Sequence, residues 1–434
     1  MFQLHLFVST DRVSFVITRL LVLLLVVLVL SSVCSAQYHP GQALSDYVQS
    51  NEKFGRKLLL AVHEADQEKN IAISPLPLSQ AFGALSEGTF DSTTRFELAN
   101  VFEWKDQPFK DIASRMLSAR IPSEKLPPQD ETETRKPSKM PPVIALPTKQ
   151  FVPLSQSTIF LYRGKGFLRD RFIEQASRDY GIQFQEAKPG ELPVPKGPDV
   201  RKMYELKSGF LDFSITTFTD LRTAWRHDLF SGRSQKLTFT LRSGSKMETD
   251  QMVSKLQLYQ HVSAHEYEAV ELPCGDAYLL VLVPAVGKDF LELEREFAAG
   301  QINLDSMLKS EEGDVALPIF HIRFLADMIS PLKKLGLNTL FTDYKSLGAM
   351  VSGTEGALLT TSVQRVDLDV DTWGIKARAI TFTGGVAGGV LGGAMSPPPR
   401  PFHMIVNRPF LFFVRDNVTD ALLFAGAEMN PAAN

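Results

Sequence analysis

The segment NRPFLFFVRDNVTDALLFAGAEMNP, residues 407–431, contains two strongly apolar runs separated by a short polar turn. The runs PFLFFVRD and DALLFAG have the length and the aromatic and branched residues of β-strands. The turn between them carries the sequon Asn417-Val418-Thr419, so Asn417 is a candidate glycosylation site in a secreted protein. The end of the chain therefore predicts two consecutive strands joined by an exposed turn.

Upstream of this segment, strand patterns and helix patterns alternate irregularly. Helical spacing of apolar residues occurs at 41–66, 76–89, 291–299 and 329–336. Strand patterns occur at 157–164, 210–218, 236–241, 255–262, 268–273, 278–284, 320–325, 365–371, 402–406, 409–416 and 420–426. Such a mixture predicts an α+β fold with more than one sheet, because regular βαβ winding would alternate strictly.

Composition limits the classes of partner. The chain has 434 residues, 44% of them hydrophobic, which is enough for a substantial core. The formal net charge is −3, and no long basic block is present. Nucleic acid is not expected as a partner, because phosphate binding needs a concentrated basic face.

The N-terminus has the layout of a secretory signal peptide. Arg12 and Arg19 precede the apolar run Leu20–Leu30, and the small residues of SSVCSAQ place the cleavage site after Ala36. We therefore expect a signal peptide at 1–36, a single domain at 37–434 and an extracellular location. The alternative is a retained signal anchor, since the apolar residues at 15–17 could extend the run, and the protein would then be membrane-tethered.

The cysteines indicate no internal disulfide. Cys34 leaves with the signal peptide, so Cys274 remains alone in the secreted domain. We expect Cys274 to be a small core or turn residue rather than a nucleophile.

The sequence carries little catalytic chemistry. It has no GxSxG, HExxH, Walker or CxxC motif. His261 and His265 would share one face of a strand while Glu266 and Glu268 point to the opposite face, so no third metal ligand is expected nearby. Asp367, Asp369 and Asp371 alternate in a strand pattern and are interpreted as a solvated face. No catalytic residue, metal or cofactor is predicted, and the protein is not expected to be an enzyme.

Two stretches have the composition of loops. Residues 121–153 are rich in proline and charge and are predicted to be an exposed insertion. The run GGVAGGVLGGAM, residues 384–395, is too glycine-rich for a stable helix, and no phosphate-loop residues follow it. We interpret it as a mobile loop.

Four stretches together resemble the serpin family. NIAISPLPLSQAFGALSEGT (70–89), VELPCGDAYLLVLVP (270–284), LKKLGLNTLF (332–341) and the C-terminal segment quoted first are each similar to a family signature. The resemblance covers about residues 45–431 and is weakest between 105 and 225. It implies a serpin fold of three β-sheets and about eight or nine helices, with an exposed reactive loop at 374–401.

The resemblance also implies a mechanism. A serine protease cleaves the reactive loop and is held as an acyl-enzyme, while the cleaved loop inserts as a new strand in the large sheet. The expected partner is a serine protease, elastase-like or chymotrypsin-like, and the serpin itself is expected to be a monomer. The hinge that inserts first corresponds to Gly374, Ile375, Lys376, Ala377, Arg378, Ala379, Ile380 and Thr381. Strand alternation places Ile375, Ala377, Ala379 and Thr381 on one face.

The reactive bond depends on the direction of counting. Counting back from Pro409-Phe410 gives Met395-Ser396, and counting forward from Gly374 gives Gly388-Gly389. We favour Met395-Ser396, because a glycine offers a protease pocket nothing to hold.

Several positions depart from the family pattern. The region where the large sheet opens corresponds to Ser74, Pro77, Thr217 and Gln364, with the last three replacing the usual Ser, Asn and His. The Phe-Lys-Gly-x-Trp segment becomes LRTAW (221–225). Residues 189–209 are too short and proline-rich for the usual helix over the sheet, and the insertion at 121–153 replaces the helix that carries heparin-binding residues. Heparin is therefore not expected as a partner. These departures keep open an alternative, a non-inhibitory serpin that is a binding or carrier protein or a plain protease substrate.

Overall fold

The computed structural model describes residues 40–104, 110, 154–162, 167–187, 211–226, 229–230, 234–275, 277–377 and 400–433. The chain divides into two compact units, 1–43 and 44–434, and the second contains the three sheets and the sites discussed below. The predicted signal peptide, the insertion at 121–153 and the glycine-rich run 384–395 lie outside the described residues. Among the described helices, none has the length and apolar character that a membrane span requires.

The helices begin where the sequence supplies caps. Pro75 occupies the first turn of α3, where its missing N–H has no cost. The Asp91 carboxylate accepts from the Thr94 amide at the start of α4, and Gly181 ends α6 in a left-handed conformation. The described helices are α2 (Pro40–His63), α3 (Pro75–Glu87), α4 (Ser92–Val101), α6 (Asp170–Tyr180), α7 (Phe290–Ala298), α8 (Leu304–Met307), α9 (Ile329–Lys334) and the 3-10 helices η3 (Thr339–Phe341) and η4 (Tyr344–Met350).

A ten-stranded sheet holds the segment quoted first. That segment forms the antiparallel pair β17–β18, in which every residue is buried. The path of the sheet is β1-β18-β17-β10-β9-β8-β11-β7-β6, and β16 pairs with β11 alone, off this path. The strands are β1 (Ile71–Ile73), β6 (Ser234–Thr240), β7 (Lys246–Val253), β8 (Gln257–Ser263), β9 (Tyr267–Pro273), β10 (Ala277–Pro284), β11 (Lys309–Pro318), β16 (Phe402–Ile405), β17 (Phe410–Asp416) and β18 (Leu422–Glu428).

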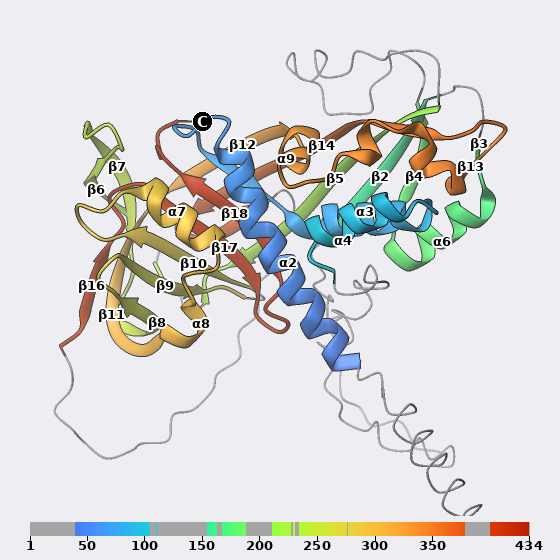
Figure 1. Cartoon of the computed structure of the whole chain (residues 1–434). Coiled ribbons are helices and arrows are strands. Elements are labelled where there is room, and N and C mark those ends of the chain that lie inside the picture. Colours follow the sequence, from blue (N-terminus) through green and yellow to red (C-terminus); the bar gives the residue numbers. More distant parts are fainter. Residues whose placement is uncertain are drawn as a thin grey trace, which may run out of the picture. The chain divides into compact units, whose positions relative to one another are not determined.

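A second sheet of six strands has the order β12-β14-β15-β5-β2-β4. Figure 1 shows α3 lying along this sheet beside β2 and β5. Its strands are β2 (Leu154–Tyr162), β4 (Gln183–Ala187), β5 (Leu211–Ala224), β12 (Phe320–Asp327), β14 (Ala357–Asp371) and β15 (Gly374–Ala377). A third sheet pairs β3 (Phe167–Leu168) with β13 (Val351–Ser352).

The architecture confirms the predicted α+β class with three sheets. The described part of the chain contains seven α-helices, slightly fewer than the eight or nine expected for the whole fold. The sequence patterns did not reveal α4 and α6, because each buries only three side chains and consists mostly of polar residues. One continuous core of buried side chains runs through both large sheets and α2–α4.

Candidate functional site

The candidate site is the seam between β14 and β5 in the six-stranded sheet. These strands pair in parallel from Ala357 opposite Leu211 to Gln364 opposite Thr217. Beyond this stretch, β15 lies between them and pairs antiparallel with both. Figure 1 shows β14 and β5 adjacent in the sheet although they are far apart in the sequence. The seam is thus closed over part of its length and occupied by β15 over the rest.

A tight turn connects β14 to β15. The Asp371 carboxylate accepts hydrogen bonds from the amides of Trp373 at 2.7 Å and Gly374 at 3.2 Å. The indole of Trp225, at the end of β5, donates to the Asp371 carbonyl at 2.6 Å, and the Trp225 amide donates to the Trp373 carbonyl at 3.2 Å. These bonds fix the turn and connect the start of β15 to both β14 and β5. In the sequence, this turn is marked by Asp371 three residues before Gly374, a common turn pattern that was not among the predictions above.

Position 374 requires a glycine because the backbones of β15 and β5 approach each other closely there. Its φ of +154° is rarely adopted by side-chain-bearing residues, and a Cβ there would lie 2.1 Å from the Thr223 carbonyl oxygen. Any other residue at position 374 must therefore move β15 away from β5. The next residue, Ile375, is fully buried in the seam.

The structure describes only the first half of the proposed hinge. Gly374, Ile375, Lys376 and Ala377 form β15. The other half, Arg378, Ala379, Ile380 and Thr381, lies outside the described residues, as do both proposed reactive bonds, Met395-Ser396 and Gly388-Gly389.

Three of the four residues assigned to the sheet-opening region meet at the end of the closed seam. The Gln364 amide nitrogen donates to the Ser74 carbonyl at 2.7 Å and to the Thr217 hydroxyl at 3.1 Å. The Gln364 amide oxygen accepts from the Ser74 amide at 2.8 Å. Ser74 also donates from its hydroxyl to the Leu423 carbonyl at 2.7 Å, which connects the cluster to β18. One glutamine thus ties β14, β5 and the start of α3 together.

Pro77, the fourth residue assigned to the sheet-opening region, contributes no side-chain hydrogen bond to this cluster. It lies buried in the first turn of α3, where its side chain offers neither a donor nor an acceptor to the cluster. Ser74, at the N-terminal boundary of the same helix, supplies backbone and hydroxyl groups.

The cysteine and the strand aspartates that were not expected to be catalytic make structural contacts. Cys274 is buried, and burial raises the pKa of its thiol, so it has little thiolate character. Asp367 pairs with Arg365, while Asp369 pairs with Arg323.

One expectation about the histidines is wrong. Glu268 does not point away from His261, because the imidazole Nε2 lies 3.1 Å from a Glu268 carboxylate oxygen. The chain reverses between β8 and β9, which returns Glu268 to the face that His261 occupies. His265 lies beyond the end of β8, in the connection to β9.

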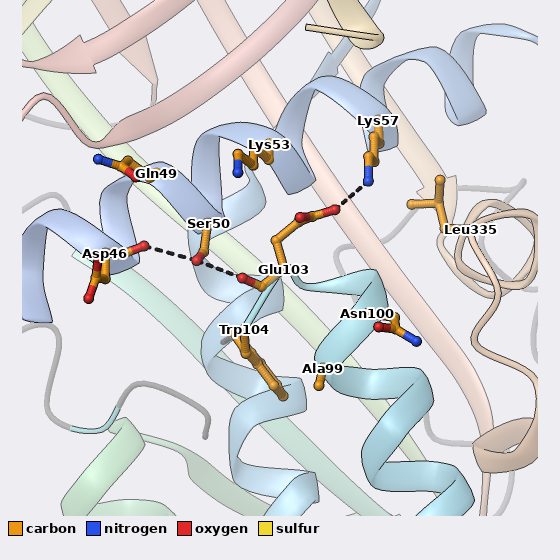
Figure 2. Close-up of a pocket in the computed structure, with 10 residues that line it drawn as sticks. All are labelled: Asp46, Gln49, Ser50, Lys53, Lys57, Ala99, Asn100, Glu103, Trp104 and Leu335. Carbon is orange, nitrogen blue, oxygen red and sulfur yellow. Dashed lines mark hydrogen bonds and ion pairs between the residues drawn. The ribbon is translucent and has the colours of Figure 1, made fainter. Parts of the chain in front are cut away.

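Two further features lie outside the seam. Asn417 is exposed in the β17–β18 turn, and its side-chain nitrogen donates to the Gly275 carbonyl at 2.9 Å. A cavity of about 510 Å³ is lined by α2, α4 and the residues that follow α4. Figure 2 shows the Ser50 hydroxyl bonded to the backbone carbonyls of Asp46 and Glu103, and Lys57 paired with Glu103. None of the residues predicted from the sequence lines this cavity.

The family comparison decides the identity of the fold. The family model described as Serpin (serine protease inhibitor) matches residues 213–431, which include most of β5 and all of β14, β15 and the C-terminal strand pair. The chain belongs to the serpin family. This serpin resembles "Probable serpin E3" of Danio rerio, with 27% identity over 217 residues, 48% of this chain and 50% of that protein. The match spans about half the length of such relatives.

A longer alignment reaches most of the chain. "Leukocyte elastase inhibitor" of Sus scrofa is 23% identical over 406 residues, covering 88% of this serpin and 98% of that protein. Among solved structures, Serpin48 of the insect Tenebrio molitor matches with a TM-score of 0.63 and 18% identity, covering 89% of this chain and 98% of that one. At this identity the structural match shows the fold alone.

Proposed function

We propose that this serpin is secreted and inhibits extracellular serine proteases as a suicide substrate, through the loop that joins Ala377 to Arg400. The observation that carries the proposal is the position of β15. The residues directly before the loop, 374–377, already pair with β14 on one side and β5 on the other. β15 therefore provides a template on which the following residues can extend the same strand.

Extension of β15 has a favourable balance of hydrogen bonds. The closed seam contributes one set of parallel pairs between β14 and β5. Insertion breaks this set and replaces it with two sets, one on each edge of the new strand. Extension also has to part Gln364 from Thr217, which is the cost of opening the seam.

The chemical step belongs to the protease. Its serine hydroxyl gives its proton to the protease's own base and attacks the carbonyl of the residue before the reactive bond. The peptide bond breaks, and the amine of the following residue takes up that proton and leaves. The loop is then joined to the protease by an ester. Insertion carries the attached protease away before water can hydrolyse that ester. The preferred bond is Met395-Ser396, with Gly388-Gly389 as the alternative.

The experiment is incubation with elastase-like, chymotrypsin-like and trypsin-like proteases, followed by denaturing gels. Inhibition predicts a covalent complex that survives SDS, and N-terminal sequencing of the released C-terminal peptide identifies the bond. Gly374→Ala should convert trapping into plain cleavage, because its Cβ meets the Thr223 carbonyl. Thr372→Ala, at a half-buried position two residues away in the same turn, is the matched control and should still trap. Complete cleavage with fully active protease would contradict the proposal.

A second candidate function is a non-inhibitory serpin that binds or carries a ligand, or is only cleaved. The observation that favours it is the closure of the seam by Gln364, whose three hydrogen bonds hold β14, β5 and α3 together. If these bonds resist opening, the loop is hydrolysed before it inserts. The gel experiment separates the two candidates, because only the inhibitor gives a covalent complex.

Secretion is a separate part of the proposal. The signal peptide pattern at 1–36 and the exposed Asn417 sequon support it. Expression of the full chain in a secretory cell should place the protein in the medium with a glycan at Asn417, removable by an amidase. Asn417→Gln should remove the mobility shift but leave secretion intact. Retention of the full chain in cell membranes would favour the signal anchor instead.

A further inference from the structure

The strand that follows the reactive loop is paired along one edge. β16 forms four parallel pairs with β11, from Gly313 opposite Phe402 to Ala316 opposite Ile405, and pairs with no other described strand. The Phe402 ring lies directly over Gly313, where a Cβ would come within 2.3 Å of it. Met404 is the fully buried side chain of β16, and the half-buried Phe402 attaches the start of the strand, where the loop ends.

Two aromatic side chains of β8 pack against the Phe402 ring. The His261 imidazole stacks on the Phe402 ring with 3.7 Å between ring centres and 3° between planes. The Tyr259 ring meets Phe402 edge-on, with centres 5.9 Å apart and planes at 71°. The near-parallel stack depends on the orientation of the imidazole.

The imidazole orientation is fixed by two carboxylates. His261 Nδ1 lies 2.7 Å from a Glu311 oxygen of β11, and Nε2 lies 3.1 Å from a Glu268 oxygen of β9. His261 is 2% exposed. Both nitrogens can donate at once only when the ring is protonated, because a neutral imidazole has a single N–H. A neutral ring would therefore set one nitrogen lone pair against a carboxylate oxygen.

The charged neighbours act on the protonated ring in both directions, because the two carboxylates favour it and the cations Lys309 and Arg408 oppose it. Glu268 on β9 and Glu311 on β11 face it, and Lys309 lies directly across from His261 in the β8–β11 register. Arg408, beyond β16, interacts with Glu268. Burial lowers the pKa of His261, but the hydrogen bonds and charges of the two glutamates outweigh burial and raise it above its ordinary value.

The titratable residue of β16, His403, makes a different contact. His403 pairs with Asp314 of β11, 2.7 Å away. Because successive residues of a strand point to opposite faces, His403 lies on the other face from Phe402. It provides a natural control on the same strand.

We propose that His261 is a pH-operated latch that holds β16, and with it the C-terminal end of the reactive loop, on β11. The protonated ring keeps both carboxylate contacts and the parallel stack on Phe402. When the proton is lost, the ring nitrogen without a hydrogen faces a carboxylate oxygen and the two repel each other. The ring then turns, and its parallel stacking on Phe402 is lost. This latch does not depend on whether the loop traps a protease.

The direction of the pH effect follows from the geometry of the ring, because Glu268 and Glu311 lie on β9 and β11 and stay in place when β16 detaches. The stack on Phe402 fixes the orientation in which both ring nitrogens must donate, so attachment of β16 favours the protonated ring and raises its pKa above that of the detached state. A group whose pKa is higher when β16 is attached stabilises attachment fully at pH values below its pKa in the detached state. That contribution is lost as the pH rises through the higher pKa of the attached state. β16 should therefore be released more often on the alkaline side. Each unit of difference between the two pKa values corresponds to about a tenfold change in the release equilibrium.

The test is hydrogen exchange of the full chain between about pH 6 and pH 9, the range that spans the histidine titration. Protection of amides in 402–406 is compared with that of β17, after correction for intrinsic exchange. Wild type should lose β16 protection as the pH rises, and His403→Gln should behave in the same way. His261→Gln, which cannot be protonated, should show no such pH dependence. The same loss of protection in His261→Gln as in wild type would overturn the proposal.

A second variant covers the case in which His261→Gln folds poorly. Glu311→Gln retains the histidine but removes one carboxylate, so both the NMR titration of His261 and the loss of β16 protection should move to lower pH together. If the titration moves and the loss of protection does not, the histidine does not control β16 and the proposal fails.

Discussion

Gln364 of β14 lies directly opposite Thr217 of β5, and its side-chain nitrogen donates to the Thr217 hydroxyl at 3.1 Å. The direct pairing of the two strands ends at these residues, and β15 occupies the space farther along the seam. The contact therefore marks the boundary between the closed and the occupied parts of the seam. Any strand that extends β15 must first break it.

Removal of the Thr217 hydroxyl should weaken this boundary. Thr217→Val leaves the Gln364 nitrogen with only the Ser74 carbonyl, and we expect a loss of about 1 kcal/mol in the free energy of unfolding, typical for a buried hydrogen bond. Thr216→Val is the matched control, because the buried Thr216 hydroxyl has no hydrogen-bond partner within the described residues. Urea denaturation should show Thr216→Val equal to or more stable than wild type. Equal losses in both variants would refute the role of Thr217.

Gln364 should matter more than Thr217, because it serves two backbone groups at once. Gln364→Leu leaves the amide and the carbonyl of Ser74 without this partner in a buried position. Each unsatisfied group costs about 1–3 kcal/mol. The comparison is Gln260→Leu on the exposed face of β8, which should change the unfolding free energy little. A Gln364→Leu protein as stable as wild type would contradict the bonding described for the cluster.

The sequence predicted most of what local patterns determine. Strand alternation and apolar runs located the C-terminal pair β17–β18, and the resemblance assigned Ser74, Thr217 and Gln364 to one region although 290 residues separate Ser74 from Gln364. The sequence could not predict that β15 already occupies the seam, because this depends on pairing between strands that are distant in the chain. The sequence prediction also assigned Glu268 to the wrong face of the sheet. It continued the alternation of one strand past the end of β8, although the chain reverses there and enters β9.

The Asp371 turn should control how firmly β15 is seated. Asp371→Ala removes the acceptor for two backbone amides, and hydrogen bonds to a charged group contribute about 1.5–3 kcal/mol each. Hydrogen exchange of residues 373–377 should become faster, while β17 remains protected. Asp367→Ala, which loses a pair with Arg365 on the same strand, should leave β15 exchange unchanged. Slow exchange of β15 in Asp371→Ala would show that the turn is not what holds it.

Glu428 gives a prediction for the pH dependence of stability. Burial is the largest influence on this carboxyl and raises its pKa well above the ordinary value. The contribution of Glu428 to stability is therefore full at pH values below its unfolded pKa and is lost as the pH rises through the folded pKa. Glu428→Gln, which stays neutral, should match wild type at pH values below the unfolded pKa of Glu428 and become the more stable protein as the pH rises above it.

The size of this effect follows from linkage. Each unit by which the folded pKa exceeds the unfolded one corresponds to about 1.36 kcal/mol at pH values above both. Thermal unfolding across the pH range measures it. Glu312→Gln, at an exposed position of β11, is the control and should follow wild type at every pH. A Glu428→Gln protein that loses stability toward neutral pH would contradict the prediction.

The central claim is that the loop beyond β15 can extend the strand between β14 and β5. The most direct measurement compares the melting temperature of the intact protein with that of the same protein nicked in the loop by a catalytic amount of protease. Insertion predicts a large rise in melting temperature after nicking, and Gly374→Ala should reduce or abolish it. An unchanged or lower melting temperature in the nicked wild type would contradict the claim.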